Sequence, residues 1–478
     1  MLQSKNINTE MDWRSILGHT LEEEYNYAPV IEGKVPENLK GTLYRNGPGR
    51  FDRGGRRKEH LLDGDGMIQA FQLLDGTAHY KNKFVRTEKY LEEEKAGKLL
   101  HETWSTRAPG GFLANLGLPR IKCQAGVTTV YRNDKLYAFD EVSNPYILDG
   151  EDLSTVGSEP VGTIDIRNYK AHTKINAKTG DWILFGTEFG KVMKAQFVIQ
   201  SKDGTIKSEF SFDLPRPSYM HDFFETENYV ILNLQPCGLN LGSTLLGLTS
   251  FISSLNWKPE KGNLLVAMHK SGTEKPIIME APTAWMWHSY NAYEVGNTII
   301  ADFIGFEKPD HFLGEDAAFK TIMHGSMGVA DSKGTSRRYE IDLTAKKVTE
   351  STIATNAVEF PAINMSKSGQ RHQYGYTSMG IENNIFHSAI ARVDLDNGQV
   401  SHFDFGDTFH VGEPIFAPDP TQSNDESKGW LLTLGLNGET GRSFLSILDA
   451  ASIEGGPVAT LHLEHHSPLS FHGFWRAG

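Results

Sequence analysis

The run 430-WLLTLGLN has the length and composition of a buried β-strand, and it ends at the turn signal Asn437-Gly438. Similar runs occur along the chain at 135-KLYAFDEV, 182-WILFGTEF, 229-YVILNLQ and 298-TIIADFIGF. Further Asp-Gly or Asn-Gly pairs, which favour hairpins, occur at 63–64, 75–76, 149–150, 203–204 and 397–398. Convincing helices are few. The pattern therefore predicts an all-β protein, either a β-propeller or a large sandwich.

The composition is that of a globular protein and argues against nucleic-acid binding. The chain has 478 residues, of which 22% are charged and 39% hydrophobic, and its net charge is −13. Nucleic-acid phosphates require a basic surface, so this acidic balance excludes them as partners. Glycines and prolines are scattered without a linker, which favours one domain over residues 1–478. No obligate protein partner is evident.

The cysteines and the first residues indicate the compartment. Cys123 and Cys237 are the only cysteines, so the chain can form at most one disulfide and has no cysteine zinc site. The opening residues, MLQSKNINTEMDW, are polar and lack the apolar core of an export signal. We therefore expect a cytoplasmic protein.

One long segment carries no charge. Residues 228–257 contain no Asp, Glu, Lys or Arg, yet polar residues interrupt them too often for a membrane-spanning helix. The first part predicts a strand. The second part predicts a helix with one apolar face, formed by Leu241, Leu245, Leu248, Ile252 and Leu255.

A second uncharged segment, 109-PGGFLANLGLP, contains Phe112, Leu113, Leu116 and Leu118. The presence of two such segments, at about 109–119 and 237–257, favours peripheral contact with a lipid surface. For the predicted helix, packing on the protein core is the alternative.

Several common catalytic motifs are missing. The chain has no phosphate-binding glycine loop before a lysine, no G-x-S-x-G turn and no H-E-x-x-H zinc helix. It does have 18 histidines, a mild excess that is compatible with a metal site. The glycine-rich stretches 46-NGPGRF and 60-HLLDGDGM lack the ligand spacing of a calcium loop and indicate tight turns.

Six stretches of the chain form a distinctive set: 43-LYRNGPG, 60-HLLDGDGM, 84-FVRTEKYLEEEKAGK, 221-HDFF, 411-VGEPIFAPDP and 465-HHSPLSFHGFW. Together they are similar to the motifs of the carotenoid cleavage oxygenases, most closely those of the cyanobacterial apocarotenoid branch. The matches run from near residue 25 to the C-terminus, so an N-terminal arm over about residues 1–25 precedes them. The resemblance implies a seven-bladed β-propeller with a cap of loops and short helices over the iron-site face.

The resemblance also implies a site with one Fe(II), bound by histidines from the inner strands. The matching positions are His172 in 170-KAHTKI, His221, His288 in 285-WMWHSYNA and His472 in 471-FHGFW. Four neutral imidazoles leave up to two positions of an octahedral ion open for dioxygen. Zinc held by three histidines is the alternative metal.

Three glutamates are implied behind the histidine rings. The matching positions are Glu141 in 138-AFDEVSNP, Glu359 in 357-AVEFPA and Glu413 in 411-VGEPIF. A carboxylate that accepts the remote ring N–H fixes the tautomer and raises the basicity of the ligand. For any single glutamate, an exposed carboxylate at a strand end is the alternative.

The surroundings of the site depart from the family pattern at two positions. Val127 stands where relatives often have Thr, and Asp140 where they can have an aromatic residue. The candidates for a non-polar substrate tunnel are Phe71, Val127, Tyr219, Trp285, Trp287 and Phe360. Ordinary propeller core is the alternative for each of them.

The function implied by the resemblance is Fe(II)-dependent cleavage of a conjugated double bond in an apocarotenoid or carotenoid, with O2 as co-substrate. Cleavage at the 15,15′ bond would give aldehydes such as retinal. Alternatives are a different cleavage position, cleavage of stilbenes or phenylpropenes, isomerisation and hydrolysis of retinyl esters, and a lipid-binding propeller without activity.

Overall fold

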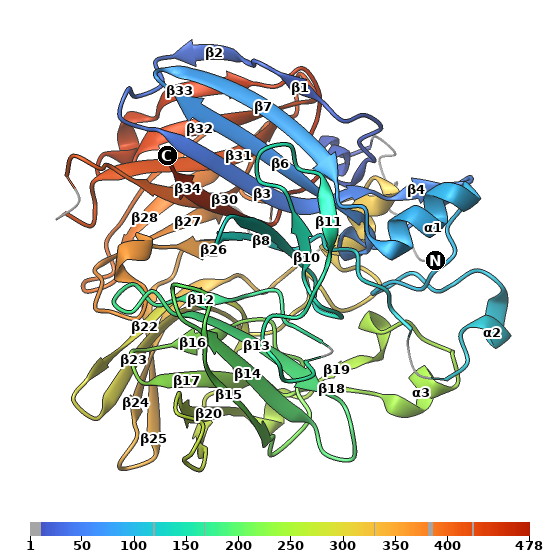
Figure 1. The fold of residues 1–478 in the computed structure, drawn as a ribbon, viewed down its shortest axis with the longest axis vertical. Helices are drawn as coiled ribbons and strands as arrows, with labels where there is room; N and C mark the ends of the chain where they lie inside the picture. The colour runs from blue at the N-terminus through green and yellow to red at the C-terminus, as the bar shows by residue number, and fades with distance from the viewer. Residues whose placement is uncertain (1–10, 118–119, 167, 329, 381–385, 423–424) are drawn as a thin grey trace, which may run out of the picture.

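The computed structural model describes residues 11–117, 120–166, 168–328, 330–380, 386–422 and 425–478. Seven antiparallel sheets surround a common axis as the blades of a β-propeller (Figure 1). The first strands of neighbouring blades contact one another, as between β22 and β16, β26 and β30, and β30 and β34. The predicted fold class, an all-β propeller of seven blades, is confirmed.

Within each blade the strands follow in order from the axis outward. From the first to the fourth blade they are β34 (His472–Ala477), β3 (Gly41–Arg50), β6 (Asp65–Leu74), β7 (Thr77–Phe84) and β1 (Asn26–Tyr27); β8 (Thr128–Arg132), β9 (Lys135–Phe139), β10 (Tyr146–Leu148) and β11 (Thr155–Ser158); β12 (Lys174–Ile175), β13 (Trp182–Glu188), β14 (Lys194–Gln200) and β15 (Ile206–Asp213); and β16 (Phe223–Glu225), β17 (Tyr229–Leu234), β20 (Asn263–His269) and β21 (Ile277–Ala281).

The remaining blades follow the same plan. They contain β22 (Trp285–Val295), β23 (Thr298–Phe306), β24 (Thr335–Asp342) and β25 (Lys347–Ala354); β26 (Ala357–Ala362), β27 (Tyr374–Gly380), β28 (Ala389–Asp394) and β29 (Val400–Asp404); and β30 (Phe409–Pro418), β31 (Gly429–Asn437), β32 (Arg442–Asp449), β33 (Pro457–His462) and β2 (Val30–Gly33). Two short ribbons lie outside the blades: β4 (Asp52–Arg53) with β5 (Arg56–Arg57), and β18 (Cys237–Leu239) with β19 (Leu255–Trp257).

Both chain ends contribute to closing the ring. The C-terminal strand β34 pairs with β3, where Asn46 lies opposite His472, and the N-terminal strand β2 pairs with β33. Five of the six predicted Asp-Gly and Asn-Gly pairs lie at connections between paired strands, whereas Asp63-Gly64 ends a 3-10 helix, where Gly64 has an extended backbone with φ −72°. Asp75 and Gly76, which join β6 to β7, have φ values of 50° and 77°, as a two-residue turn of the I′ type requires.

Helices are short and lie in the connections. The α-helices are α1 (Glu88–Ala96), α2 (Gly111–Ala114), α3 (Leu241–Leu245) and α4 (Ala318–Thr321), and the 3-10 helices are η1 (Trp13–Gly18), η2 (Leu61–Asp63), η3 (Ile252–Ser254), η4 (Pro259–Lys261), η5 (Ile322–His324), η6 (Met365–Lys367) and η7 (Ile453–Gly455). Residues from η2 and α4 line a cavity beside the four histidines, so these connections cap that face.

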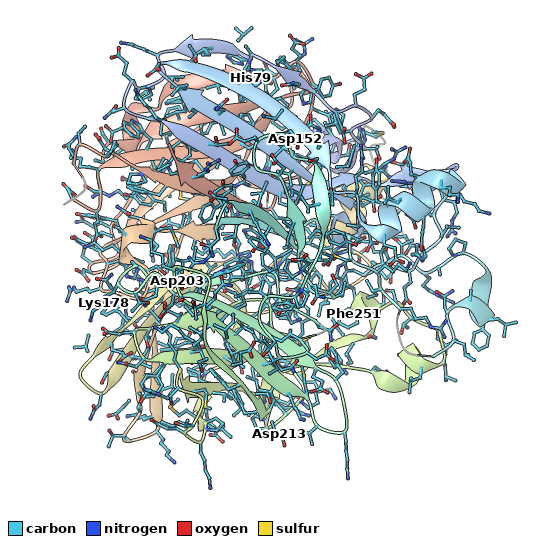
Figure 2. All side chains as sticks on the ribbon, viewed as in Figure 1. His79, Asp152, Lys178, Asp203, Asp213 and Phe251 are labelled. Carbon is cyan, nitrogen blue, oxygen red and sulfur yellow. The ribbon has the colours of Figure 1, made fainter. Side chains whose placement is uncertain are left out.

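The predicted long helix over residues 241–255 is wrong. Helix α3 ends at Leu245, and Gly247 then takes a φ of 62° while packed so tightly that a Cβ would lie 2.3 Å from the carbonyl oxygen of Asn115. Phe251, labelled in Figure 2, contacts Trp104, and Ile252 packs into the core below. The segment therefore divides into an exposed half and a buried half. Among the described residues, no helix is both long and apolar enough to cross a membrane.

Candidate metal centre

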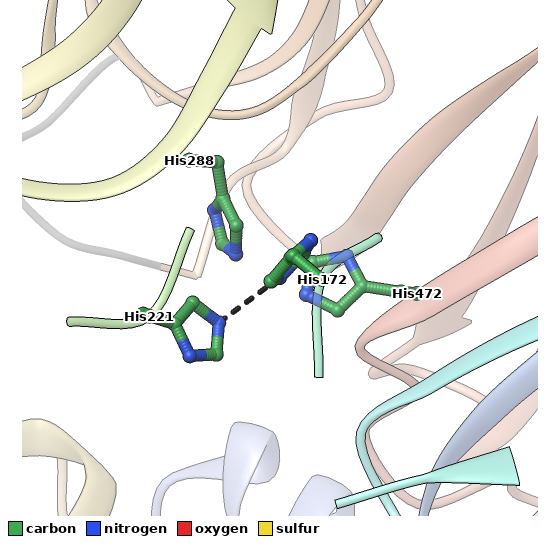
Figure 3. Close-up of side chains that lie close together, drawn as sticks. All are labelled: His172, His221, His288 and His472. Atoms are coloured by element: carbon green, nitrogen blue, oxygen red, sulfur yellow. Dashed lines mark hydrogen bonds between the residues drawn. The ribbon is translucent and has the colours of Figure 1, made fainter. Parts of the chain in front are cut away.

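Four histidines from four blades meet on the propeller axis. His172 and His221 lie two residues ahead of β12 and β16, His288 lies within β22, and His472 begins β34. One ring nitrogen from each lies within 4.8 Å of the others, and Nε2 of His172 is 3.0 Å from Nε2 of His221 (Figure 3). Four nitrogens gathered in this way form a set of donors that fits a metal ion.

Irregular strands aim several of these side chains inward. The register of β22 shifts between Met286 and Ser289, where His288 lies, and those of β26 and β30 shift next to Glu359 and Glu413. A β-bulge redirects a side chain that regular alternation would place elsewhere. The inner strands can therefore close the propeller and still direct His288, Glu359 and Glu413 toward the axis.

Three of the histidines have a glutamate behind them. Nδ1 of His221 lies 2.5 Å from Oε1 of Glu141, Nδ1 of His288 lies 2.7 Å from Oε2 of Glu359, and Nδ1 of His472 lies 2.9 Å from Oε1 of Glu413. Because Nδ1 donates to a carboxylate, Nε2 keeps its lone pair for a metal. Consistent with this, Nε2 of His288 is buried and has no hydrogen-bond partner among the described residues.

The three carboxyl groups are buried yet favour the charged form. Burial raises the pKa of each, but the paired histidine and, beside Glu141, Lys170 outweigh this, so all three pKa values lie below their ordinary value. Glu413 also accepts from Arg45 at 2.8 Å and from the backbone N–H of Gly473 at 2.8 Å. Three carboxylates thus place negative charge around a site whose ligands are neutral.

His172 is held differently. Among the described residues, no carboxylate accepts a hydrogen bond from its ring. Instead, two residues further on, Lys174 lies 2.8 Å from an oxygen of Asp222 and 2.9 Å from Oγ of Ser289. Asp222 follows His221 and Ser289 follows His288, so this Lys174–Asp222–Ser289 cluster joins the strands of three histidines. Burial and the neighbouring histidines hold the pKa of His172 well below its ordinary value.

Cavities lie on both sides of the four histidines. A cavity of about 440 Å³ follows the propeller axis, and its lining includes Lys174, Asp222, Asn291, His172 and His472. A cavity of about 50 Å³ lies on the cap side, and it is lined mainly by apolar side chains together with His221, His288 and His472. The four histidines therefore lie between a larger cavity along the axis and a smaller cavity on the cap side.

Comparisons with known proteins identify the family. The chain matches the family model described as retinal pigment epithelial membrane protein over residues 18–477. It is 31% identical to the apocarotenoid-15,15′-oxygenase of Synechocystis sp. over 467 residues, which cover 95% of this chain and 94% of that protein. The chain belongs to the carotenoid cleavage oxygenase family.

Other members of the family are also similar to this oxygenase. Isoeugenol monooxygenase of Pseudomonas nitroreducens is 28% identical, with 93% of each chain covered. The crystal structure of the cobalt-substituted Synechocystis apocarotenoid oxygenase superposes with a TM-score of 0.90 and 30% identity, covering 98% of both chains. The protein is thus an enzyme of the class of carotenoid and apocarotenoid cleavage dioxygenases.

The tunnel candidates fall into three groups in this oxygenase. Val127, Trp287 and Phe360 line the cap-side cavity next to the histidines. Tyr219 and Trp285 stack on each other behind Trp287 and line neither of the two cavities.

Phe71 does not belong with the other candidates. It faces away from the axis into the core between the first and last blades, where it contacts Tyr80. Its position in β6, one strand outward from β3, places it too far from the axis to reach the site.

Arg45 and Asp222 were not predicted as site residues, and Asp140 was predicted only as a departure from the family pattern near the site. Arg45 donates to Glu413 and to the carbonyl oxygens of Ser470 and Phe471, next to His472. Asp140 is buried and accepts from the backbone N–H groups of Gln124 and Glu141, at 2.9 and 2.7 Å. The sequence contains one signal for Arg45 and Asp222. Both lie within stretches that resemble the family motifs, and Asp222 directly follows His221.

Proposed function

We propose that this oxygenase uses Fe(II) and dioxygen to cleave the 15,15′ double bond of an apocarotenoid, which would give aldehyde products such as retinal. The observation that carries the proposal is the convergence of His172, His221, His288 and His472 on one point, with Glu141, Glu359 and Glu413 behind three of them. The similarity to the Synechocystis apocarotenoid-15,15′-oxygenase supports the substrate class and the cleavage position.

The roles of the chain's own groups follow from their contacts. The four histidines would hold the iron through Nε2, and the three glutamates would keep the rings in the tautomer that binds metal. Iron(II), when bound, would supply the redox chemistry that activates dioxygen. Val127, Trp287 and Phe360 would exclude water and contact the polyene on the cap side.

A phenylpropene is the second candidate substrate. Two observations favour it: isoeugenol monooxygenase is among the relatives, and the cap-side cavity of about 50 Å³ is small. A short aromatic alkene needs less room beside the metal than a polyene that extends to both sides. Cleavage at another carotenoid position is a third outcome that the same assay would identify.

Product analysis distinguishes these candidates. Iron-loaded protein is incubated aerobically with apocarotenals of several lengths and with isoeugenol, and the products are identified by mass spectrometry. We expect a retinal-type aldehyde from the apocarotenals and little product from isoeugenol. Vanillin from isoeugenol with intact apocarotenals would overturn the proposal in favour of the second candidate.

We also propose that the enzyme collects its substrate at a membrane surface. Six exposed apolar side chains form an apolar patch on the connections that carry α2 and α3: Phe112, Leu113, Leu116, Leu245, Leu246 and Leu248. The two connections touch, since the N–H of Gly117 donates to the carbonyl oxygen of Leu245 at 2.9 Å. Leu118 of the predicted segment lies outside the described residues. Such a surface favours insertion into one leaflet.

A further inference from the structure

We propose that the cap-side cavity contains a binding site for a single hydroxyl oxygen, formed by His311 on one side and Glu359 on the other. Both side chains line this cavity beside His288 and His472. His311 is not one of the four clustered histidines, and only one of the two Glu359 carboxylate oxygens accepts from His288. The occupant is either a bound water or the hydroxyl group of a substrate.

The contact with Trp287 fixes the tautomer of His311. The indole N–H of Trp287 lies 2.6 Å from Nε2 of His311. An indole nitrogen can only donate, so Nε2 must accept and must carry no hydrogen. The side chain of His311 is buried, which lowers its pKa to about 4 and keeps the ring neutral at pH 7. Its single ring hydrogen is therefore on Nδ1.

This Nδ1–H has no acceptor within the described part of the chain. His311 is only 1% exposed, and its Nδ1 is buried without a hydrogen-bond partner. A buried donor without an acceptor is costly and uncommon in folded proteins. The geometry therefore calls for an acceptor from outside the described residues.

Glu359 supplies the complementary group. Its Oε2 accepts from His288 and from the backbone N–H of Phe360, whereas Oε1 is buried and has no donor among the described residues. His311 and Glu359 both belong to the lining of the one cap-side cavity. A third group in the lining of the same cavity, Nδ1 of His410, also has no hydrogen-bond partner in the part of the chain that the structure describes.

These groups select the chemistry of the occupant. A hydroxyl group or a water accepts from His311 and donates to Glu359, whereas a carbonyl cannot donate and an ammonium cannot accept. A metal cation would suit Glu359 but would be repelled by the N–H of His311. The cavity of about 50 Å³ is large enough for a water or a hydroxyl group, since one water needs about 10–15 Å³ of such space.

The site has two consequences. An oxygen bound there would fix the free side of Glu359 and so help to hold the ring of His288. It would also place a hydrogen-bonding oxygen in a chamber that is lined mainly by apolar side chains. A substrate whose hydroxyl reaches this point would be favoured over the same substrate without it.

The first test is crystallographic and requires no turnover. Cobalt-loaded wild-type protein is crystallised alone and with 4-hydroxystilbene, and His311→Phe is treated in the same way. We expect an ordered oxygen within hydrogen-bond distance of both His311 Nδ1 and Glu359 Oε1, and its loss in His311→Phe. If neither wild-type crystal contains such an oxygen, the proposal is wrong.

The second test distinguishes the two sources. If the substrate hydroxyl occupies the site, cobalt-loaded protein binds 4-hydroxystilbene about tenfold more tightly than stilbene, and His311→Phe abolishes the difference. If water occupies it, both ligands bind equally and His311→Phe weakens cobalt binding about threefold. Unchanged cobalt affinity together with unchanged ligand preference would overturn the site.

A matched variant separates the site from a folding defect. His311→Gln keeps one group that accepts from Trp287 and one that donates, so we expect it to retain most of the effect that His311→Phe removes. Melting temperatures show whether either variant is unfolded. The substrate arm rests on the proposed function, but the bound oxygen and the cobalt affinity are measured without catalysis. A missing oxygen or an unchanged cobalt affinity would therefore contradict the proposed site, whereas a lack of apocarotenal cleavage would contradict the proposed function.

Discussion

His288 and His172 point at the same spot but are held in opposite ways. His288 donates to Glu359, a buried carboxylate in direct contact with its ring. His172 has no such partner among the described residues and depends on the Lys174–Asp222–Ser289 cluster, which fixes its strand rather than its ring. His172 is also the only one of the four histidines that is partly exposed.

The difference has a physical reason. Three carboxylates already surround the neutral ligands with negative charge, and a fourth would add repulsion among buried charges. The ion pair of Lys174 and Asp222 is neutral as a whole, so it can order the fourth strand without changing the charge at the metal. Three ligands are thus fixed through their rings and one through its backbone.

The largest effect is expected from loss of a ligand. His288→Ala removes one of four metal-binding nitrogens and also leaves Glu359 buried without its partner, so metal affinity should fall by more than about 100-fold. Metal analysis after dialysis measures this, and His402→Ala, at an exposed position of β29, is the control. Full metal content in the His288→Ala protein would rule out His288 as a ligand.

A smaller effect is expected from the carboxylates behind the rings. Glu359→Gln and Glu413→Gln keep the shape but lose the charge that orients the imidazole, so metal affinity should fall about 10- to 100-fold. Cobalt titration followed by absorption measures the change, with Glu340→Gln on the exposed face of β24 as the control. If both variants bind cobalt as tightly as the wild type, the glutamates do not act on the ligands.

The Lys174–Asp222–Ser289 cluster should have a weaker effect on the metal. Asp222→Asn removes the charge that holds Lys174 but leaves every ring contact in place, so we expect cobalt affinity to fall only about threefold to tenfold. The control is Lys178→Met, which breaks an exposed ion pair of 2.6 Å between Lys178 and Glu227 in the same two blades (Figure 2).

The relative losses of cobalt affinity in Glu359→Gln and Asp222→Asn test whether His288 and His172 are held differently. If Asp222→Asn weakens cobalt binding as strongly as Glu359→Gln, then His172 is held as firmly as His288. The claim that the two histidines are held differently would then be incorrect.

The two halves of the segment after β18 should separate stability from membrane contact. Leu245 and Leu248 are 44% and 56% exposed, whereas Ile252 is 5% exposed. Leu245→Ser with Leu248→Ser should reduce co-sedimentation with vesicles and leave the metal and the melting temperature unchanged. Ile252→Ala should instead destabilise the fold by about 2–5 kcal/mol. Unaltered vesicle binding by the double variant would remove the membrane role.

Much of the fold could be predicted from sequence because the relevant signals are local. Apolar runs predicted strands correctly, and five of the six Asp-Gly and Asn-Gly pairs lie at connections between paired strands, the exception being Asp63-Gly64 at the end of η2. All five quoted runs lie in strands, from 135-KLYAF in β9 to 430-WLLTLGLN in β31. The long helix over 241–255 failed because its apolar spacing suits a helix although Gly247 requires a φ that stops one.

The site was predictable only where a motif carried it. The positions of the four histidines and three glutamates came from resemblance, and the structure brings them together as one group. The partners of Arg45 and Lys174 lie 368 and 48 residues away in the chain, so no local pattern could reveal them. In the sequence, Phe71 could not be distinguished from the other aromatic tunnel candidates. Its distance from the axis depends on the place of β6 within the blade, which the sequence does not reveal.

The most direct test of the central claim is to compare metal content with activity. Purified protein is depleted of metal, reloaded with Fe(II) or with Zn(II), and assayed aerobically with an apocarotenal while bound metal is measured by mass spectrometry. We predict about one iron per chain, cleavage in proportion to bound iron, and no cleavage by the zinc-loaded protein. Full cleavage by the metal-depleted or the zinc-loaded protein would contradict the account.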